Sequence, residues 1–190
     1  MNEALNKAAQ EAVCEELHTG FEEADLQPTP EGALPAAWGD MLNLARAELP
    51  ARAENVAVAR AFVAALVAAR PEANWDITVS TLEEIRVAVS EAVSNAIIHG
   101  YAEDPKRTVK LKAEQYQYAL VIEVVDDGIG IADIARAREP DFTTGQEHLG
   151  LGFAFMESFM DELEVKSAPG RGTAVTLIKY FPAENLRVQA

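Results

Sequence analysis

The 190-residue chain is poor in cysteine, in aromatic residues and in positive charge. Its single cysteine, Cys14, excludes an internal disulfide and fits a reducing cytoplasm. The longest apolar run, residues 56–69, contains Arg60 and is too short to span a bilayer, so no membrane association is expected. Residues 1–20 have no basic start followed by an apolar core, which excludes a typical secretory signal. These absences predict a cytoplasmic protein.

Acidic residues outnumber basic ones, 31 to 16, and the net charge is −15. Direct binding to nucleic acid is not expected, because neutralising phosphates needs a basic surface. The acid is uneven: residues 1–40 hold nine acids and one lysine, a net charge of −8, which leaves −7 for residues 41–190. This asymmetry separates an acidic extension from the main domain.

We therefore divide the chain into an acidic N-terminal extension (1–40), a main domain (41–182) and a C-terminal tail (183–190). Within the extension, apolar spacing predicts an amphipathic helix over 2–17, and the proline and glycine content of 20–39 predicts a linker. A docking helix and a mobile solubilising tail both fit this extension.

From residue 41 onward, the periodicity predicts an α+β sandwich in which a mixed or antiparallel sheet carries helices on one face. Ser80 or Thr81 is expected to cap the longest helix, with Glu83 and Glu84 in its first turn. The expected strands are 41–49, 108–113, 118–125, 163–167 and 173–180; the expected helices are 55–69, a long one that includes 82–96, 133–138 and 151–160.

Three polar residues on the long helix, Glu91, Asn95 and His99, follow one another at intervals of four. On an α-helix this spacing aligns their side chains along one row. A carboxylate, an amide and an imidazole beside a core face need partners, and the spacing suits a helix that faces a phosphate-bound metal ion. The ordinary alternative is the solvated face of a helix.

A second motif, Asp126-x-Gly128-x-Gly130, comes directly after an apolar strand. Glycine lets the backbone approach a flat ligand where a Cβ would collide. A carboxylate at the strand end can accept a hydrogen bond from an exocyclic amine such as adenine N6. By itself the motif is more typical of a plain Asp-Gly turn.

Two further glycine motifs follow. Gly150-Leu151-Gly152 opens a helix, and the unpaired N–H groups of a helix start favour phosphate. Gly170-Arg-Gly-Thr173 leads into the last strand and places the Thr173 hydroxyl near a sheet edge. Each of these two motifs also occurs as simple loop or hairpin punctuation.

The four motifs in this order resemble the Bergerat ATP-binding fold that DNA gyrase, histidine kinases and the MutL mismatch-repair proteins share. Residues 82–101, 139–144 and 152–161 resemble more closely the anti-sigma F factors of sporulation, a family of serine kinases. The resemblance covers residues 41–181 and does not reach the acidic extension.

This resemblance implies ATP and Mg²⁺ as ligands, with Glu91 as the general base and Asn95 as the Mg²⁺ ligand. It implies that Asp126 binds adenine N6, with Thr173 nearby, and that Arg60 contacts partner proteins. The remaining residues that it assigns to the pocket, the lid and the phosphate-contacting helix start are Gly128, Gly130, Thr144, Gly150, Leu151 and Gly152.

The resemblance also implies a function. A homodimer would hold a sporulation sigma factor inactive when ATP is bound, and would phosphorylate a serine of a STAS-type anti-anti-sigma protein. ATP would favour the sigma complex and ADP the antagonist complex. A kinase that acts on a general-stress sigma system is the nearest alternative.

The sequence departs from the family in one place. No Lys or Arg occurs between Arg138 and Lys166, the lid segment 144–150 is short, and His148 is the only nearby substitute for a basic lid residue. We expect ATP binding with altered lid contacts, and a nucleotide-gated binding module without phosphate transfer remains an alternative.

A sensor histidine kinase fits poorly, because His18 is the only histidine ahead of the ATP-binding motifs. A gyrase-like or repair ATPase would need far more chain.

Overall fold

The computed structural model describes residues 38–69, 75, 77–138 and 151–181. The predicted N-terminal helix and C-terminal tail lie outside these residues and stay predictions, and so does the predicted linker apart from Trp38 and Gly39. The described elements, in chain order, are β1 (Met41–Pro50), α2 (Asn55–Ala68), α3 (Val79–Asn95), the π-helix η3 (Ala96–Gly100), β2 (Thr108–Tyr116), β3 (Ala119–Asp126), α4 (Ile134–Ala137), α5 (Gly152–Phe159), β4 (Glu162–Ala168) and β5 (Gly172–Tyr180).

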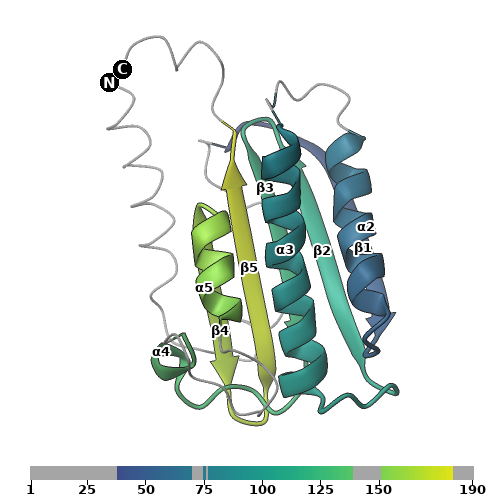
Figure 1. Cartoon of the computed structure of the whole chain (residues 1–190), viewed down its shortest axis with the longest axis vertical. Helices are drawn as coiled ribbons and strands as arrows, with labels where there is room; N and C mark the ends of the chain where they lie inside the picture. The colour runs from purple at the N-terminus through teal and green to yellow at the C-terminus, as the bar shows by residue number, and fades with distance from the viewer. Residues whose placement is uncertain (1–37, 70–74, 76, 139–150, 182–190) are drawn as a thin grey trace.

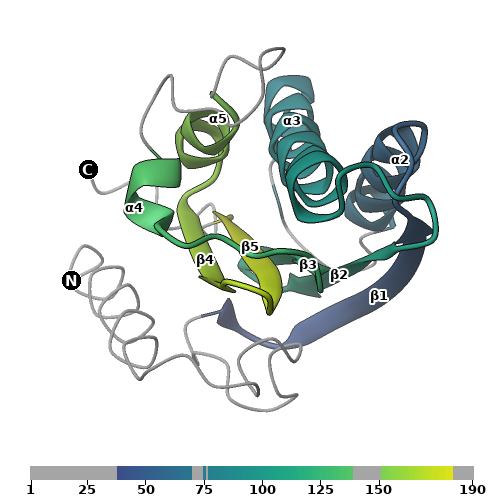
Figure 2. The ribbon, with the colours of Figure 1, turned by 90° about the horizontal axis from the view of Figure 1, so that it is seen from below.

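The strands form one five-stranded sheet in the order β1-β2-β3-β5-β4, and every neighbouring pair is antiparallel. Helices α2, α3 and α5 all cover the same face of the sheet, with α3 between the other two (Figures 1 and 2). This arrangement confirms the predicted α+β sandwich.

The core lies between the sheet and the helices and follows from two periodicities. Alternate residues of each strand point to the helices, and α3 buries one stripe of apolar side chains against these strand residues. Each large side chain that is fully buried in this way contributes about 1.5–3 kcal/mol to stability. The central members are Ile85, Ala88, Val89, Ala92 and Val93 from α3, and Val109, Leu111, Ala113, Leu120, Ile122, Val124, Val175 and Leu177 from the sheet.

The N-terminus of α3 differs from the prediction. Thr78, in an extended conformation, is the N-cap, and its Oγ1 accepts a hydrogen bond of 3.0 Å from the backbone N–H of Thr81. The expected cap at Ser80 or Thr81 is therefore wrong. In a run of closely spaced hydroxyl residues, the first whose backbone is extended takes the capping role, because the next ones are already helical. As a result no acidic residue lies in the first turn of α3.

The C-terminal end of this helix also departs from the expected α geometry. From Ala96 to Gly100 the chain forms a π turn, in which the N–H of Tyr101 donates to the carbonyl of Ala96 at 3.0 Å. A π turn holds more residues than an α turn. Glu91 and Asn95 lie on the α-helical part, and His99 lies in the π turn, so its place in the predicted row stays a prediction.

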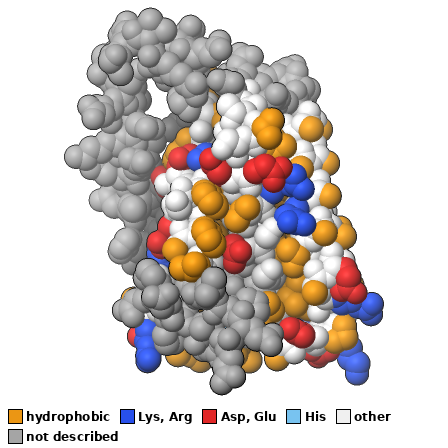
Figure 3. Space-filling model, in the orientation of Figure 1, with side chains coloured by type: hydrophobic (Ala, Val, Ile, Leu, Met, Phe, Trp, Pro, Cys, Tyr) orange, Lys and Arg blue, Asp and Glu red, His pale blue; other side chains and the backbone are white. Residues whose placement is uncertain are grey.

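The remaining boundaries agree with the predictions within a few residues. The largest difference is β2, which runs to Tyr116 instead of residue 113, because it pairs with β1 along its whole length. Hydrophobic side chains gather on the outer surface of α5 (Figure 3), where Phe155 is 40% exposed and stacks on Phe159. Within the described ranges, we find no helix with the length and apolar character needed to cross a membrane.

Candidate functional site

The site begins where the end of β3 lies beside the start of β5. Asp126 is the last residue of β3 and pairs in register with Thr173 of β5. Because strand side chains alternate, Asp126 has the same orientation as Leu120, Ile122 and Val124, toward the helices. Asp126 is therefore only 4% exposed, at the edge of the core and beside the π turn that follows α3.

The Asp126 carboxylate is held in an unfavourable environment for a charge. Burial raises its pKa to about 6, and the nearby charge of Asp127 adds to this, whereas hydrogen bonds from the backbone N–H groups of Gly128 and Thr173 oppose it. The bond from Gly128 N to Asp126 Oδ1 measures 2.9 Å. At pH 7 the carboxylate is still mostly ionised, so it can act as an acceptor for an amine of a bound ligand.

The loop after β3 lies directly against the π turn. A Cβ at Gly128 would collide with the carbonyl of Gly100, and a Cβ at Gly100 would lie 2.7 Å from Asp126 Oδ1. The N–H of Ile129 donates to the carbonyl of Gly100 at 3.1 Å. Glycine is thus required on both sides of this contact, which the Asp-x-Gly motif predicted on one side only.

Further along the same loop, Gly130 has a φ of +69°, which is strained for other residues. Next to it, the N–H of Ile131 donates to Ser167 Oγ at 2.7 Å, and Ser167 Oγ lies 3.0 Å from Thr173 Oγ1. The Thr173 hydroxyl therefore belongs to a small network that holds the loop to β4. The backbone N–H of Thr173 donates a hydrogen bond to the Asp126 carboxylate.

Glu91 and Asn95 come to this region from α3, one helical turn apart and both half-buried. They face the start of α5: a Cβ at Gly152 would lie 3.0 Å from Glu91 Oε2 and 3.4 Å from Asn95 Nδ2. The structure thus brings three of the predicted residues together from two helices. Glycine at position 152 leaves space beside the carboxylate and the amide that any other residue would fill.

The start of α5 has the properties of an anion site. Its N-cap is Leu151, and no described side chain caps the helix. The backbone N–H groups of a first turn without a cap, at the positive end of the helix dipole, favour a phosphate group. They are adjacent to Glu91 and Asn95, so phosphate would lie next to the carboxylate.

Arg60 is not part of this site. It lies on α2, and α3 separates α2 from α5 (Figure 2). Arg60 is half-buried, and its Nε atom is buried without a hydrogen-bond partner. The lid residues Thr144, His148 and Gly150 lie outside the described residues, so their roles remain predictions.

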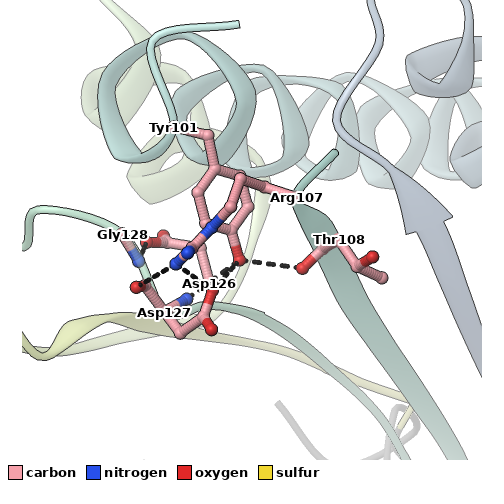
Figure 4. A network of polar contacts seen from close by, with 6 residues as sticks. All are labelled: Tyr101, Arg107, Thr108, Asp126, Asp127 and Gly128. Atoms are coloured by element: carbon pink, nitrogen blue, oxygen red, sulfur yellow. Dashed lines mark hydrogen bonds and ion pairs between the residues drawn. The ribbon is translucent and has the colours of Figure 1, made fainter. Parts of the chain in front are cut away.

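Sequence reasoning missed three residues beside the site. Tyr101, Arg107 and Asp127 form a polar network behind the loop that carries Asp126 and Gly128 (Figure 4). Their only sequence signal is local: Tyr101 ends the helical motif and Asp127 is the variable position of the Asp-x-Gly motif. Nothing in the spacing shows that residues 20 to 26 positions apart meet there.

Comparison with known proteins places this geometry in a family. The model of the histidine kinase-like ATPase domain matches residues 49–179. The anti-sigma F factor of Thermoanaerobacter sp. (strain X514) is 42% identical over 144 residues, which cover 75% of this chain and 96% of the relative. That of Geobacillus kaustophilus (strain HTA426) is 44% identical over 143 residues, with 74% and 94% covered.

Among solved structures, the RsbU and RsbW domains of Rv1364c from Mycobacterium tuberculosis match with a TM-score of 0.52 and 24% identity. The match covers 75% of this chain and 34% of that chain, and at this identity it shows the fold alone. The family match and the long alignments with high identity go further. The chain belongs to the histidine kinase-like ATPase family and, within it, to the anti-sigma F factors.

Proposed function

We propose that the protein is an anti-sigma factor and an ATP-dependent protein-serine kinase. In this proposal it sequesters a sporulation sigma factor as a homodimer and phosphorylates a serine of a STAS-type anti-anti-sigma protein. The observation that carries the enzymatic part is the close approach of Gly152 to Glu91 and Asn95, at a helix start suited to phosphate. The names of the relatives, anti-sigma F factors, support the sigma-binding part.

At the purine end, the buried carboxylate of Asp126 would accept a hydrogen bond from adenine N6. Its Oδ1 already accepts from Gly128 N, which fixes the orientation of the carboxyl group. A buried carboxylate with few partners gains from such a donor, because an uncompensated buried charge is unfavourable. Thr173 and the two glycines of the loop would shape the pocket around the base.

At the phosphate end, the start of α5 would bind phosphate oxygens through its backbone N–H groups. The described residues contain no group of three or more His, Cys, Asp or Glu side chains that could hold a metal. An Mg²⁺ ion beside Asn95 would therefore take most of its ligands from phosphate and water, which is its usual mode in proteins. When bound, the ion would neutralise charge that develops on the transferred phosphate.

In the transfer step, a serine hydroxyl oxygen bonds to the γ-phosphorus as the bond to the β–γ bridging oxygen breaks. Glu91 would receive the hydroxyl proton, and ADP would leave. The geometry supports this role because Glu91 lies one turn from Asn95 and next to the phosphate-binding helix start. Positioning and charge neutralisation supply most of the catalysis in such reactions.

The sigma-binding state would depend on the nucleotide, with ATP favouring the sigma complex and ADP the antagonist complex. Arg60 would contact the partner proteins from α2, away from the nucleotide. A cytoplasmic location follows from this role. Co-purification from the host with ATP, and again with ADP, identifies the partners and distinguishes a sporulation sigma factor from one of general stress.

Glu91→Gln tests the kinase. The expected result is loss of phosphate transfer from ATP to the co-purified antagonist by at least about 100-fold, since a general base typically contributes 10²–10⁴-fold, with no loss of ADP affinity. Glu83→Gln is the matched control, because it makes the same change on an exposed residue of the same helix. Transfer by Glu91→Gln at the wild-type rate contradicts the proposal.

A second function is kept open by the sequence, which has no Lys or Arg between Arg138 and Lys166 to contact the γ-phosphate. If the protein transfers no phosphate, it is a nucleotide-gated binding module. It then binds its sigma factor only with ATP, and the wild-type protein leaves no phosphoserine on the antagonist.

A further inference from the structure

The polar network behind the purine loop converges on Tyr101, which immediately follows the π turn. The tyrosine is buried, and its hydroxyl oxygen lies 2.7 Å from Asp127 Oδ1, 2.8 Å from the carbonyl oxygen of Thr108 and 2.9 Å from the backbone nitrogen of Asp127 (Figure 4). A phenol has one hydrogen to donate. It therefore donates to one of the two acceptors and accepts from the N–H of Asp127.

Arg107 also binds Asp127. Its Nη2 donates to both the carbonyl oxygen and Oδ1 of Asp127, at 2.8 Å each. Its guanidinium group also lies over the Tyr101 ring, 5.1 Å from the centroid. Asp127 is thus held through its N–H, its carbonyl and its carboxylate.

The protonation states fit these contacts. The hydrogen bond from Tyr101 lowers the pKa of Asp127, so this carboxylate is ionised near neutral pH. Burial, followed by the hydrogen bond with Asp127, raises the pKa of Tyr101, which keeps the phenol protonated as a donor. Both partners therefore stay in the states that the contacts require.

The position of Asp127 in the chain gives the network its consequence. It lies between Asp126, which faces the purine site, and Gly128, which donates to Asp126 Oδ1. The loop is also bonded to Gly100 through Ile129. Any rotation of the Asp127 peptide would therefore move both the carboxylate and the N–H that orients it.

We propose that Tyr101, Arg107 and Asp127 form a clamp that positions the Asp126 carboxylate for purine recognition and thereby sets nucleotide affinity and base selectivity. The clamp residues are positioning residues. Because Tyr101 directly follows the π turn that continues α3, the clamp also joins the purine loop to the helix that carries Glu91 and Asn95. The inference rests on the proposed function, since it assumes that Asp126 binds adenine.

Tyr101→Phe in the full chain tests the clamp, because it removes one oxygen and keeps the ring. Calorimetric titration with ADP, and separately with GDP, measures affinity and selectivity. We expect ADP affinity to fall about three- to tenfold, the range for a lost hydrogen bond, and the preference for ADP over GDP to shrink. The KM for ATP should rise while kcat changes by less than about twofold, since Tyr101 does not contact the reacting groups.

Tyr180→Phe is the matched control. Its hydroxyl also donates to a carboxylate, Glu162 at 2.7 Å, but at the opposite end of β5 from Thr173. This variant should bind ADP and GDP as the wild type does. An equal loss of affinity in both tyrosine variants would overturn the clamp, because it would indicate a general effect of destabilisation.

Wild-type ADP affinity and an unchanged ADP-to-GDP ratio in Tyr101→Phe would also overturn the inference while leaving the proposed function intact. Failure of the wild type to bind ADP or ATP would instead overturn the proposed function. If Tyr101→Phe does not fold, Arg107→Gln replaces it, because Arg107 is partly exposed and its loss removes both contacts to Asp127. It should lower ADP affinity and selectivity in the same direction, and wild-type values would refute the clamp.

Discussion

The buried carboxylate of Asp126 should make the protein less stable as the pH rises through the range of its titration. Its pKa is about 6 in the folded protein against 3.8 for the exposed group, so the folded state binds the proton more tightly. Stability therefore falls with rising pH, because the folded state holds more protons than the unfolded state between these values. The effect is absent well below pH 3.8 and complete above about pH 7.

The magnitude follows from the two pKa values. The difference of 6 − 3.8, or about 2.2 units, corresponds to about 3 kcal/mol at pH 7. At pH 5 the same linkage gives about half of this, so the contribution changes by about 1 kcal/mol between pH 5 and 7. Asp126→Asn removes the ionisation, and any fixed effect of the amide group cancels when the two pH values are compared.

The assay is urea unfolding of the wild type and Asp126→Asn without nucleotide, at pH 5 and pH 7. The stability of Asp126→Asn relative to the wild type should increase by about 1 kcal/mol at the higher pH. Asp127→Asn is the control. Because the pKa of Asp127 is lowered, this carboxylate stabilises the fold above its ordinary pKa of 3.8, and that stabilisation is lost only at lower pH. The difference of this control from the wild type should change much less between pH 5 and pH 7 than that of Asp126→Asn, because the charge of Asp127 makes only a secondary contribution to the raised pKa of Asp126. A constant difference for Asp126→Asn, or one of opposite sign, would refute the reasoning.

Three further substitutions test the local geometry. Gly152→Ala places a Cβ 3.0 Å from Glu91 Oε2, so phosphate transfer should fall about tenfold. The free energy of unfolding should stay equal or rise by up to about 1 kcal/mol. An unchanged transfer rate would contradict the close approach. Gly130→Ala should destabilise the fold by at least about 1–2 kcal/mol in urea unfolding, because of its positive φ, and a smaller loss would mean that the loop adapts. Thr78→Ala should lower stability by about 1 kcal/mol by thermal unfolding, through loss of the α3 cap, and should leave ADP affinity unchanged; no loss would show that the cap is dispensable.

The parts of the fold that repeat along the chain could be predicted from the sequence. The two-residue period of β3 places Asp126 on the face that also carries Leu120 and Ile122, and the stripe of α3 follows from steps of three and four. The fold class and the family follow from the order of the four motifs. These features are local, so each segment carries its own signal.

The features that the sequence did not reveal depend on contacts between distant segments or on competing local choices. The π turn after Asn95 has no compositional signal, and it ends where Gly100 meets the loop after β3. Thr78 competes with two nearby hydroxyl residues for the cap, and only the backbone conformation decides. The contact of Tyr101 with Asp127 spans 26 positions and depends on how α3 lies over β3.

The central claim is a purine nucleotide pocket that is built around Asp126 and bordered by Glu91, Asn95 and the start of α5. Its most direct test is calorimetric titration of the full-length protein with ATP and Mg²⁺. We predict saturable binding of one ATP per chain, weakened about 100-fold by Asp126→Asn, because a hydrogen bond to a charged acceptor contributes about 1.5–3 kcal/mol. Absence of binding at saturating ATP, or equal affinity of the wild type and Asp126→Asn, would contradict the account.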